Sequence, residues 1–96
     1  MTLDDAGRIT FFSHGAERIT GWQREQILDQ SCDEFFKPVE IDAPFTQLIP
    51  LPGLSNKIVV KLADERMATL AVTGARLAYP EAGDSQIAVV FRDVTE

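Results

Sequence analysis

Residues 7–22 read GRITFFSHGAERITGW and decide the fold. Gly7 follows Asp4-Asp5-Ala6, and glycine can adopt the positive φ that closes a hairpin. Residues 9–12 are β-branched or aromatic, which strands prefer. The first half of the stretch therefore predicts a tight turn followed by a short strand.

The second half of the stretch predicts a helix with both ends marked. Ser13 can accept a backbone N–H bond as the N-cap of a helix over residues 14–20. Gly21 stands where helices end in a left-handed residue. Trp22 then precedes a second short helix near residues 24–28, so two helices are expected to follow the strand closely.

A capped turn and one further helical segment are expected in the middle of the chain. Ser31 and Glu34 match the S-x-x-E pattern of a capping box, and the turn that they open is expected to bury Phe35 or Phe36. Residues 43–49 predict one to two helical turns, with a proline near their start.

After Asn56 the apolar period changes to two, which predicts strands. One strand follows Asn56, a second is expected over residues 67–77 and the last over residues 86–92. A polar turn at 64–66 and a longer loop at 79–84 separate them. Two strands, three helices and three strands in this order predict an antiparallel sheet with helices on one face, an α+β fold.

Both ends of the chain resemble a PAS domain. Residues 7–22 resemble the opening pattern D-x-G-x-I followed by N-x-A-A-E-x-x-T-G-Y, with Ser13 at the Asn position and Trp22 at the Tyr position. Residues 90–96, VFRDVTE, resemble the V-x-R-D-V/I-T-E that closes such domains. The resemblance covers nearly the whole chain and implies a five-stranded antiparallel sheet with short helices on one face.

Length and charge narrow the classes of function. Ninety-six residues make one domain, and the net charge of −6 with scattered basic residues argues against nucleic-acid binding. No apolar run approaches a membrane span, and no signal peptide is visible. We therefore expect a cytoplasmic domain, or the cytoplasmic part of a membrane-anchored sensor, without direct membrane contact.

The two termini look trimmed beside the PAS pattern. Only Met1-Thr2-Leu3 precede the first turn, and the closing motif, which leads into a connecting helix in PAS proteins, ends here at Glu96. We expect residues 1–96 to be a single PAS domain excised from a longer signalling protein.

Haem and flavin are both expected to be absent. His14 is the only histidine and is expected in solvent, while haem-binding PAS sensors carry their ligand near residues 43–50, which contain neither His nor Cys. Cys32 falls at the photoreactive position of light-sensing flavin domains of the PAS family, but Asp33 replaces the basic residue that faces the flavin phosphate. We expect Cys32 to be buried and inert.

The positions that read the flavin edge in those domains are also apolar here. They fall at Val60, Leu70 and Phe91. The residues on this side of the sheet either fill the core or line a small apolar pocket for a fatty or aromatic metabolite. The candidate lining residues are Ile58, Val60, Leu62, Leu70, Val72, Val89 and Phe91, with Ile87 beside them.

The sequence carries no catalytic constellation. The only histidine lies in an expected helix cap, so no Ser-His-Asp arrangement can form, and no P-loop or H-E-x-x-H motif occurs. The resemblance instead implies a non-catalytic sensory or protein-interaction module, most simply of a sensor histidine kinase in a two-component phosphorelay. The alternative is a ligand-free dimerisation domain of a diguanylate cyclase or of a PAS-containing transcriptional regulator.

Signal output is expected at the C-terminal motif. In PAS domains its Asp and Thr link the last strand to the following helix, and here these positions are Asp93 and Thr95.

The outward face of the three long strands is unusually apolar for a surface exposed to water. Small and apolar residues on neighbouring strands form one patch, and such patches mark interfaces. We expect a homodimer through this face or through flanking helices. The predicted interface residues are Val59, Ala71, Thr73, Ala75, Leu77, Ala88 and Val90, with Ala63 at the edge.

Overall fold

The computed structural model describes residues 1–50, 52–79 and 84–95, and the side chains within them except those of 77–79, 84 and 85. The elements are β1 (Thr2–Leu3), β2 (Ile9–Phe11), α1 (His14–Thr20), α2 (Arg24–Ile27), α3 (Cys32–Phe35), α4 (Phe45–Leu48), β3 (Asn56–Lys61), β4 (Met67–Tyr79) and β5 (Asp84–Asp93). The expected order of strands is confirmed, but four helices rather than the expected three lie between β2 and β3, because the turn that follows Ser31 forms α3.

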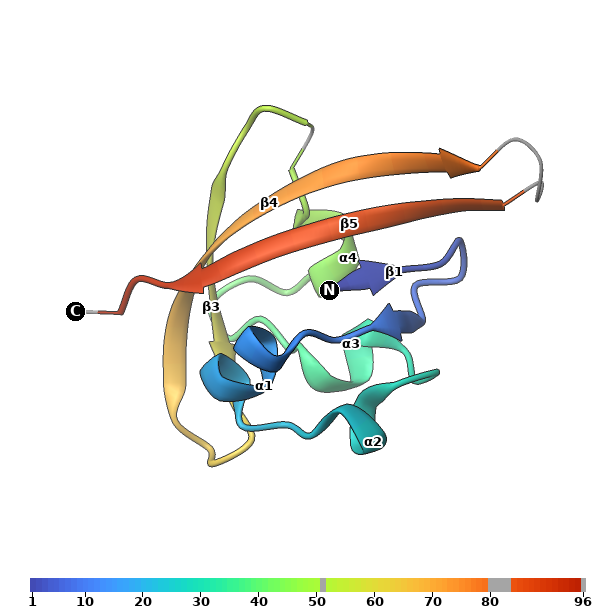
Figure 1. Cartoon of the computed structure of the whole chain (residues 1–96). Helices are drawn as coiled ribbons and strands as arrows, with labels where there is room; N and C mark the ends of the chain where they lie inside the picture. Colours follow the sequence, from blue (N-terminus) through green and yellow to red (C-terminus); the bar gives the residue numbers. More distant parts are fainter. Residues whose placement is uncertain (51, 80–83, 96) are drawn as a thin grey trace.

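All five strands join one antiparallel sheet in the order β2-β1-β5-β4-β3 (Figure 1). The short first strand lies between β2 and β5, where Thr2 pairs with Ala88. The long β4 and β5 pair from Leu70↔Asp93 to Tyr79↔Asp84, so both extend further than the sequence predicted. The predicted α+β fold is therefore observed, and residues 80–83 of the expected loop lie outside the described residues.

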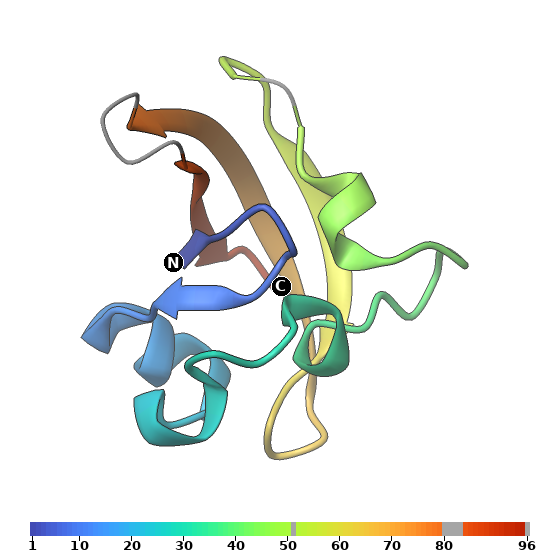
Figure 2. The same cartoon turned by 90° about the vertical axis from the view of Figure 1, so that its right-hand side faces the viewer.

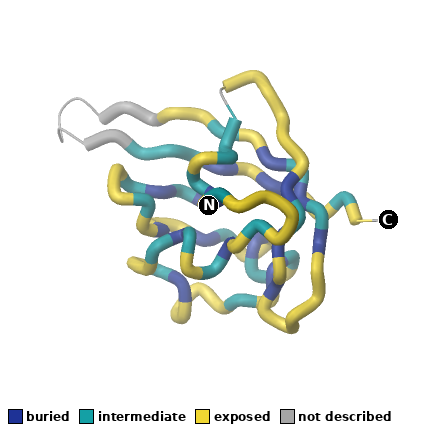
Figure 3. Tube along the Cα trace, turned by 180° about the vertical axis from the view of Figure 1, so that it is seen from behind, coloured by how far each residue is buried: buried dark blue, intermediate teal, exposed yellow. Residues whose placement is uncertain are grey.

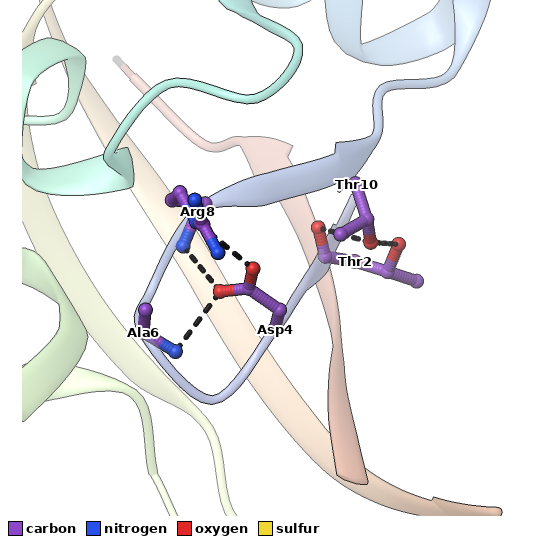
Figure 4. Close-up of polar contacts among 5 residues, drawn as sticks. All are labelled: Thr2, Asp4, Ala6, Arg8 and Thr10. Atoms are coloured by element: carbon purple, nitrogen blue, oxygen red, sulfur yellow. Dashed lines mark hydrogen bonds and ion pairs between the residues drawn. The ribbon is translucent and has the colours of Figure 1, made fainter. Parts of the chain in front are cut away.

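The turn between β1 and β2 is held by one carboxylate (Figure 4). The side chain of Asp4 accepts hydrogen bonds from the N–H groups of Ala6 at 2.9 Å and Arg8 at 2.8 Å, and from Arg8 Nε at 3.1 Å. These bonds, with the backbone bond from Arg8 first, hold the pKa of Asp4 below its ordinary value. Gly7 has φ of 80°, which confirms the predicted hairpin turn.

Helix α1 has the two ends that the sequence predicts. Ser13 Oγ accepts from the N–H of Ala16 at 3.1 Å. Gly21 has φ of 85°, and its N–H donates to the carbonyl of Glu17 at 2.8 Å. Both local predictions are confirmed.

Gly21→Ala is expected to lower the free energy of unfolding by about 1 kcal/mol or more, because alanine is strained at positive φ. The added Cβ would also lie 3.2 Å from Ala63 Cβ. Thermal unfolding measures the loss. Gly15→Ala is the matched control, since it lies inside α1 with only Ser13 Oγ near, at 3.9 Å, and should be neutral or stabilising. An unchanged midpoint for Gly21→Ala would contradict the left-handed cap.

The predicted capping box at Ser31 is wrong. Ser31 makes no capping bond with its side chain and instead forms an isolated antiparallel bridge with Arg8. A comparable pair occurs one helix earlier, where Gln26 Oε1 accepts from the N–H of Gln23 at 2.9 Å. Tertiary pairing of Ser31 thus replaces the local cap.

The core lies between the sheet and the short helices (Figure 2), and Figure 3 shows the buried residues concentrated between these layers. The alternation predicted for the long strands is confirmed: Ile58, Val60, Leu70, Val72 and Val89 are buried. From the helical side the core receives Phe12, Ala16, Ile27, Cys32, Phe36 and Phe45.

Candidate signal-output site

The chain leaves the sheet at the end of β5 (Figure 1), where the predicted output residues lie. Both backbone groups of Thr69 at the start of β4 are bound there: its carbonyl accepts from the N–H of Val94 at 2.9 Å, and its N–H donates to Thr95 Oγ1 at 2.9 Å. The threonine hydroxyl thus takes the place of a strand carbonyl. The junction is held by hydrogen bonds on an exposed surface rather than by burial in the core.

Asp93 closes the same junction. Its Oδ1 accepts from the N–H of Thr95 at 2.9 Å and from Thr95 Oγ1. Its Oδ2 lies 3.8 Å from Arg66 Nη1, and Arg66 Nε lies 3.6 Å from a carboxylate oxygen of Asp64. The hydroxyl bond from Thr95, then its backbone bond, hold the pKa of Asp93 below its ordinary value, and Arg66 adds to this.

Acid weakens this arrangement. Because the folded-state pKa of Asp93 is lowered, its contribution to stability is present above the ordinary carboxyl pKa and is lost as the pH falls through the lower, folded value. Asp93 lies on the surface, so solvent screening keeps this contribution small.

Two partners of the junction were missed from the sequence. Arg66 was treated only as part of a polar turn, and Thr69 only as a strand residue. The register that pairs Leu70 with Asp93 brings them beside the C-terminal motif. Only the long-range pairing of β4 with β5 carries that information.

The predicted pocket positions all face the helices. Val60, Leu70, Val72, Ile58 and Val89 are 0–1 % exposed, Leu62 4 % and Phe91 8 %. The Phe36 ring packs against Phe91, one of these positions, and against three further aromatic residues. Its centroid lies 5.5 Å from that of Phe91, 5.0 Å from Phe45, 5.1 Å from Trp22 and 6.5 Å from Phe12.

His14 and Cys32 are the residues that were considered for cofactor ligation. His14 is exposed, with Nδ1 3.4 Å from Glu17 Oε1. Cys32 is fully buried, as expected, and burial raises the pKa of its thiol, which favours the neutral form. No group of three His, Cys, Asp or Glu in the described part of the chain could hold a metal ion.

The outward sheet face is largely as predicted. Val59, Ala71 and Ala88 are half-buried, and Thr73, Ala75 and Val90 are exposed, with Val90 67 % exposed. The side chain of Leu77 lies outside the described residues. Ala63 does not belong to this face, because β3 ends at Lys61 and the N–H of Ala63 donates to the carbonyl of Thr20 at 3.1 Å.

Phe11 extends the same face and was missed. It is 52 % exposed and pairs with Thr2, which in turn pairs with Ala88. The sequence did not predict on which face of the sheet Phe11 lies. The register shift between Thr2 and Leu3 interrupts the regular alternation of β2, so the alternation rule does not apply there.

Among the described residues, no helix has the length and apolar character needed to cross a membrane. No curated protein matches the chain. The family model described as the PAS domain matches residues 1–96, which is the whole chain. With the sheet order, the short helices and the C-terminal junction in agreement, the chain belongs to the PAS domain family.

Proposed function

We propose that this PAS domain relays a signal to a C-terminal effector through the junction of Asp93 and Thr95. A PAS domain is a sensory or signalling module, and such modules are generally non-catalytic. The observation that carries the proposal is the exposed hydrogen-bond network of Asp93, Thr95, Thr69 and Arg66. Such a network can exist in two arrangements that a signal stabilises unequally.

The host that we propose is a sensor histidine kinase of a two-component phosphorelay, with the domain in the cytoplasm. The negative net charge supports a role without nucleic acid or direct membrane contact. Haem and flavin are proposed to be absent, because the exposed His14 and the apolar Val60, Leu70 and Phe91 offer them no matching polar contacts. A visible absorption band of stoichiometric intensity in purified protein would contradict this.

A ligand-free dimerisation domain, in a diguanylate cyclase or a transcriptional regulator, is the second candidate. The packing of Phe36 against Phe91 and Phe45 favours it, since these rings occupy the interior where a metabolite would bind. In both candidates we propose that two copies associate through the outward sheet face, with Val90 near its centre.

Asp93→Ala tests the output role. In the host kinase we compare autophosphorylation with the signal to autophosphorylation without it. We expect Asp93→Ala to change this ratio by about fivefold or more, the lower end of typical coupling between sites. Thermal unfolding of the domain should shift little, because Asp93 lies on the surface. Asp42→Ala, which removes an exposed carboxylate elsewhere, is the control. Normal switching with only a lower unfolding midpoint would show that Asp93 is a structural cap.

A further inference from the structure

Strand β4 carries a cation on the side of the sheet that faces the helices. Val72 pairs with Phe91, Gly74 with Val89 and Arg76 with Ile87. Alternate residues of a strand share a face, so Arg76 follows buried Val72 on the inner side. Arg76 therefore lies beyond the packed core but still on the inner face of β4.

The chain segment after α4 crosses β4 just before Arg76. A Cβ added at Gly74 would lie 2.6 Å from Ile49 Cγ2 and 3.3 Å from the carbonyl oxygen of Pro50. Only glycine allows this close approach.

A hollow of about 400 Å³ lies at this place. Its volume falls within the range of small-molecule sites. Arg76 is among its lining residues, and the walls beside it are mainly aliphatic, contributed by Ile49, Pro50, Pro52 and Ile87. It differs from the interior position considered above, since neither Val60 nor Leu70 lines it.

Among the described lining residues of the hollow, Arg76 is the charged one, and this favours an anion. Arg76 has no ion pair or hydrogen bond with the described residues. The adjoining hollow contains the acids Asp4, Asp5 and Asp33. Asp4 is paired with Arg8, Asp33 accepts from the N–H and hydroxyl of Thr46, and Asp5 has an interaction partner as well. Among the residues that the structure describes, Arg76 therefore has no carboxylate partner.

We propose that this hollow binds an organic carboxylate with an apolar body, of the size of a medium-chain fatty acid. The planar guanidinium of Arg76 suits bidentate pairing with a carboxylate. The hydrocarbon body would lie against Ile49, Pro52 and Ile87, which removes apolar surface from water. The site goes beyond the proposed output role, because binding here needs neither Asp93 nor a particular host.

Octanoate is the probe, and octanol is the same chain without the charge. Titration of the isotope-labelled domain should give saturable amide shifts centred on Ile49, Gly74 and Ile87, with octanoate binding more tightly than octanol. Arg76→Gln should weaken octanoate binding by about tenfold, since a charge-assisted bond is lost, and should leave octanol binding unchanged. Arg92→Gln is the matched control, because Arg92 is exposed at the outward-facing parity of β5.

Three results would overturn the proposal. The first is equal octanoate affinity of wild type and Arg76→Gln. The second is no saturation up to about 5 mM, which is too weak for a specific site. The third is amide shifts centred on Val60 and Leu70 instead. An unaltered circular dichroism spectrum shows that Arg76→Gln is folded. None of these results bears on the Asp93 experiment, which reads kinase output.

Discussion

Phe36→Ala is expected to lower the free energy of unfolding by about 3–5 kcal/mol, the usual cost of removing a buried aromatic ring. The ring is fully buried and lies within 5.0–6.5 Å, centroid to centroid, of Phe12, Trp22, Phe45 and Phe91. Urea unfolding followed by circular dichroism measures the loss. It is a large share of the roughly 5–15 kcal/mol that stabilises a domain.

Phe35→Ala is the matched control for this prediction. Phe35 is the neighbouring residue, is half-buried, and has a ring contact with Trp22 alone among the described aromatic pairs. Phe35→Ala should lower the free energy of unfolding clearly less than Phe36→Ala does. Phe36→Leu keeps most of the volume and should fold even if Phe36→Ala does not, with an intermediate loss. Equal losses at positions 35 and 36 would contradict a central role for Phe36.

The same substitution distinguishes the two interpretations of the interior. If the core is filled, Phe36→Ala leaves a dry apolar cavity that binds a small aromatic molecule such as benzene, while wild type does not. If wild type already has a ligand cavity there, benzene should bind both proteins. Stabilisation by benzene in thermal unfolding separates these outcomes.

Local chemistry made the first third of the chain predictable. Gly7 and Gly21 have left-handed φ values, and Ser13 caps α1, as residue type and spacing predicted. These features depend on neighbours within four residues. The alternation of the long strands likewise identified Val60 and Leu70 as inward-facing.

Features that depend on register or on close packing could not be predicted in this way. The sequence left Phe35 and Phe36 as equal candidates for burial. In a short helical turn, which of two adjacent residues is buried depends on the elements that pack against the turn. The sequence offered no reason for a glycine at position 74, whereas the contact with Ile49 requires one. Thr69 became a partner of Thr95 only through the pairing of β4 with β5.

Val90→Lys is expected to weaken the proposed homodimer by about a hundredfold or more, because burying an unpaired ammonium in an apolar interface costs several kcal/mol. Val90 is 67 % exposed, and its strand neighbour Thr73 is exposed as well. The next pairs along the strands are Ala75 with Ala88 on one side and Ala71 with Arg92 on the other. A second cation beside Arg92 adds like-charge repulsion to the cost of desolvation.

Analytical ultracentrifugation over a range of concentrations measures the shift, and an unaltered circular dichroism spectrum shows that the variant is folded. Ile41→Lys is the matched control: Ile41 is also an exposed β-branched residue, at 48 %, but it lies in the segment between α3 and α4. It should leave association unchanged. If both variants weaken the dimer equally, the effect is not specific to the outward sheet face, which would contradict the proposed interface. If wild type is monomeric at high concentration, two copies do not associate through this face.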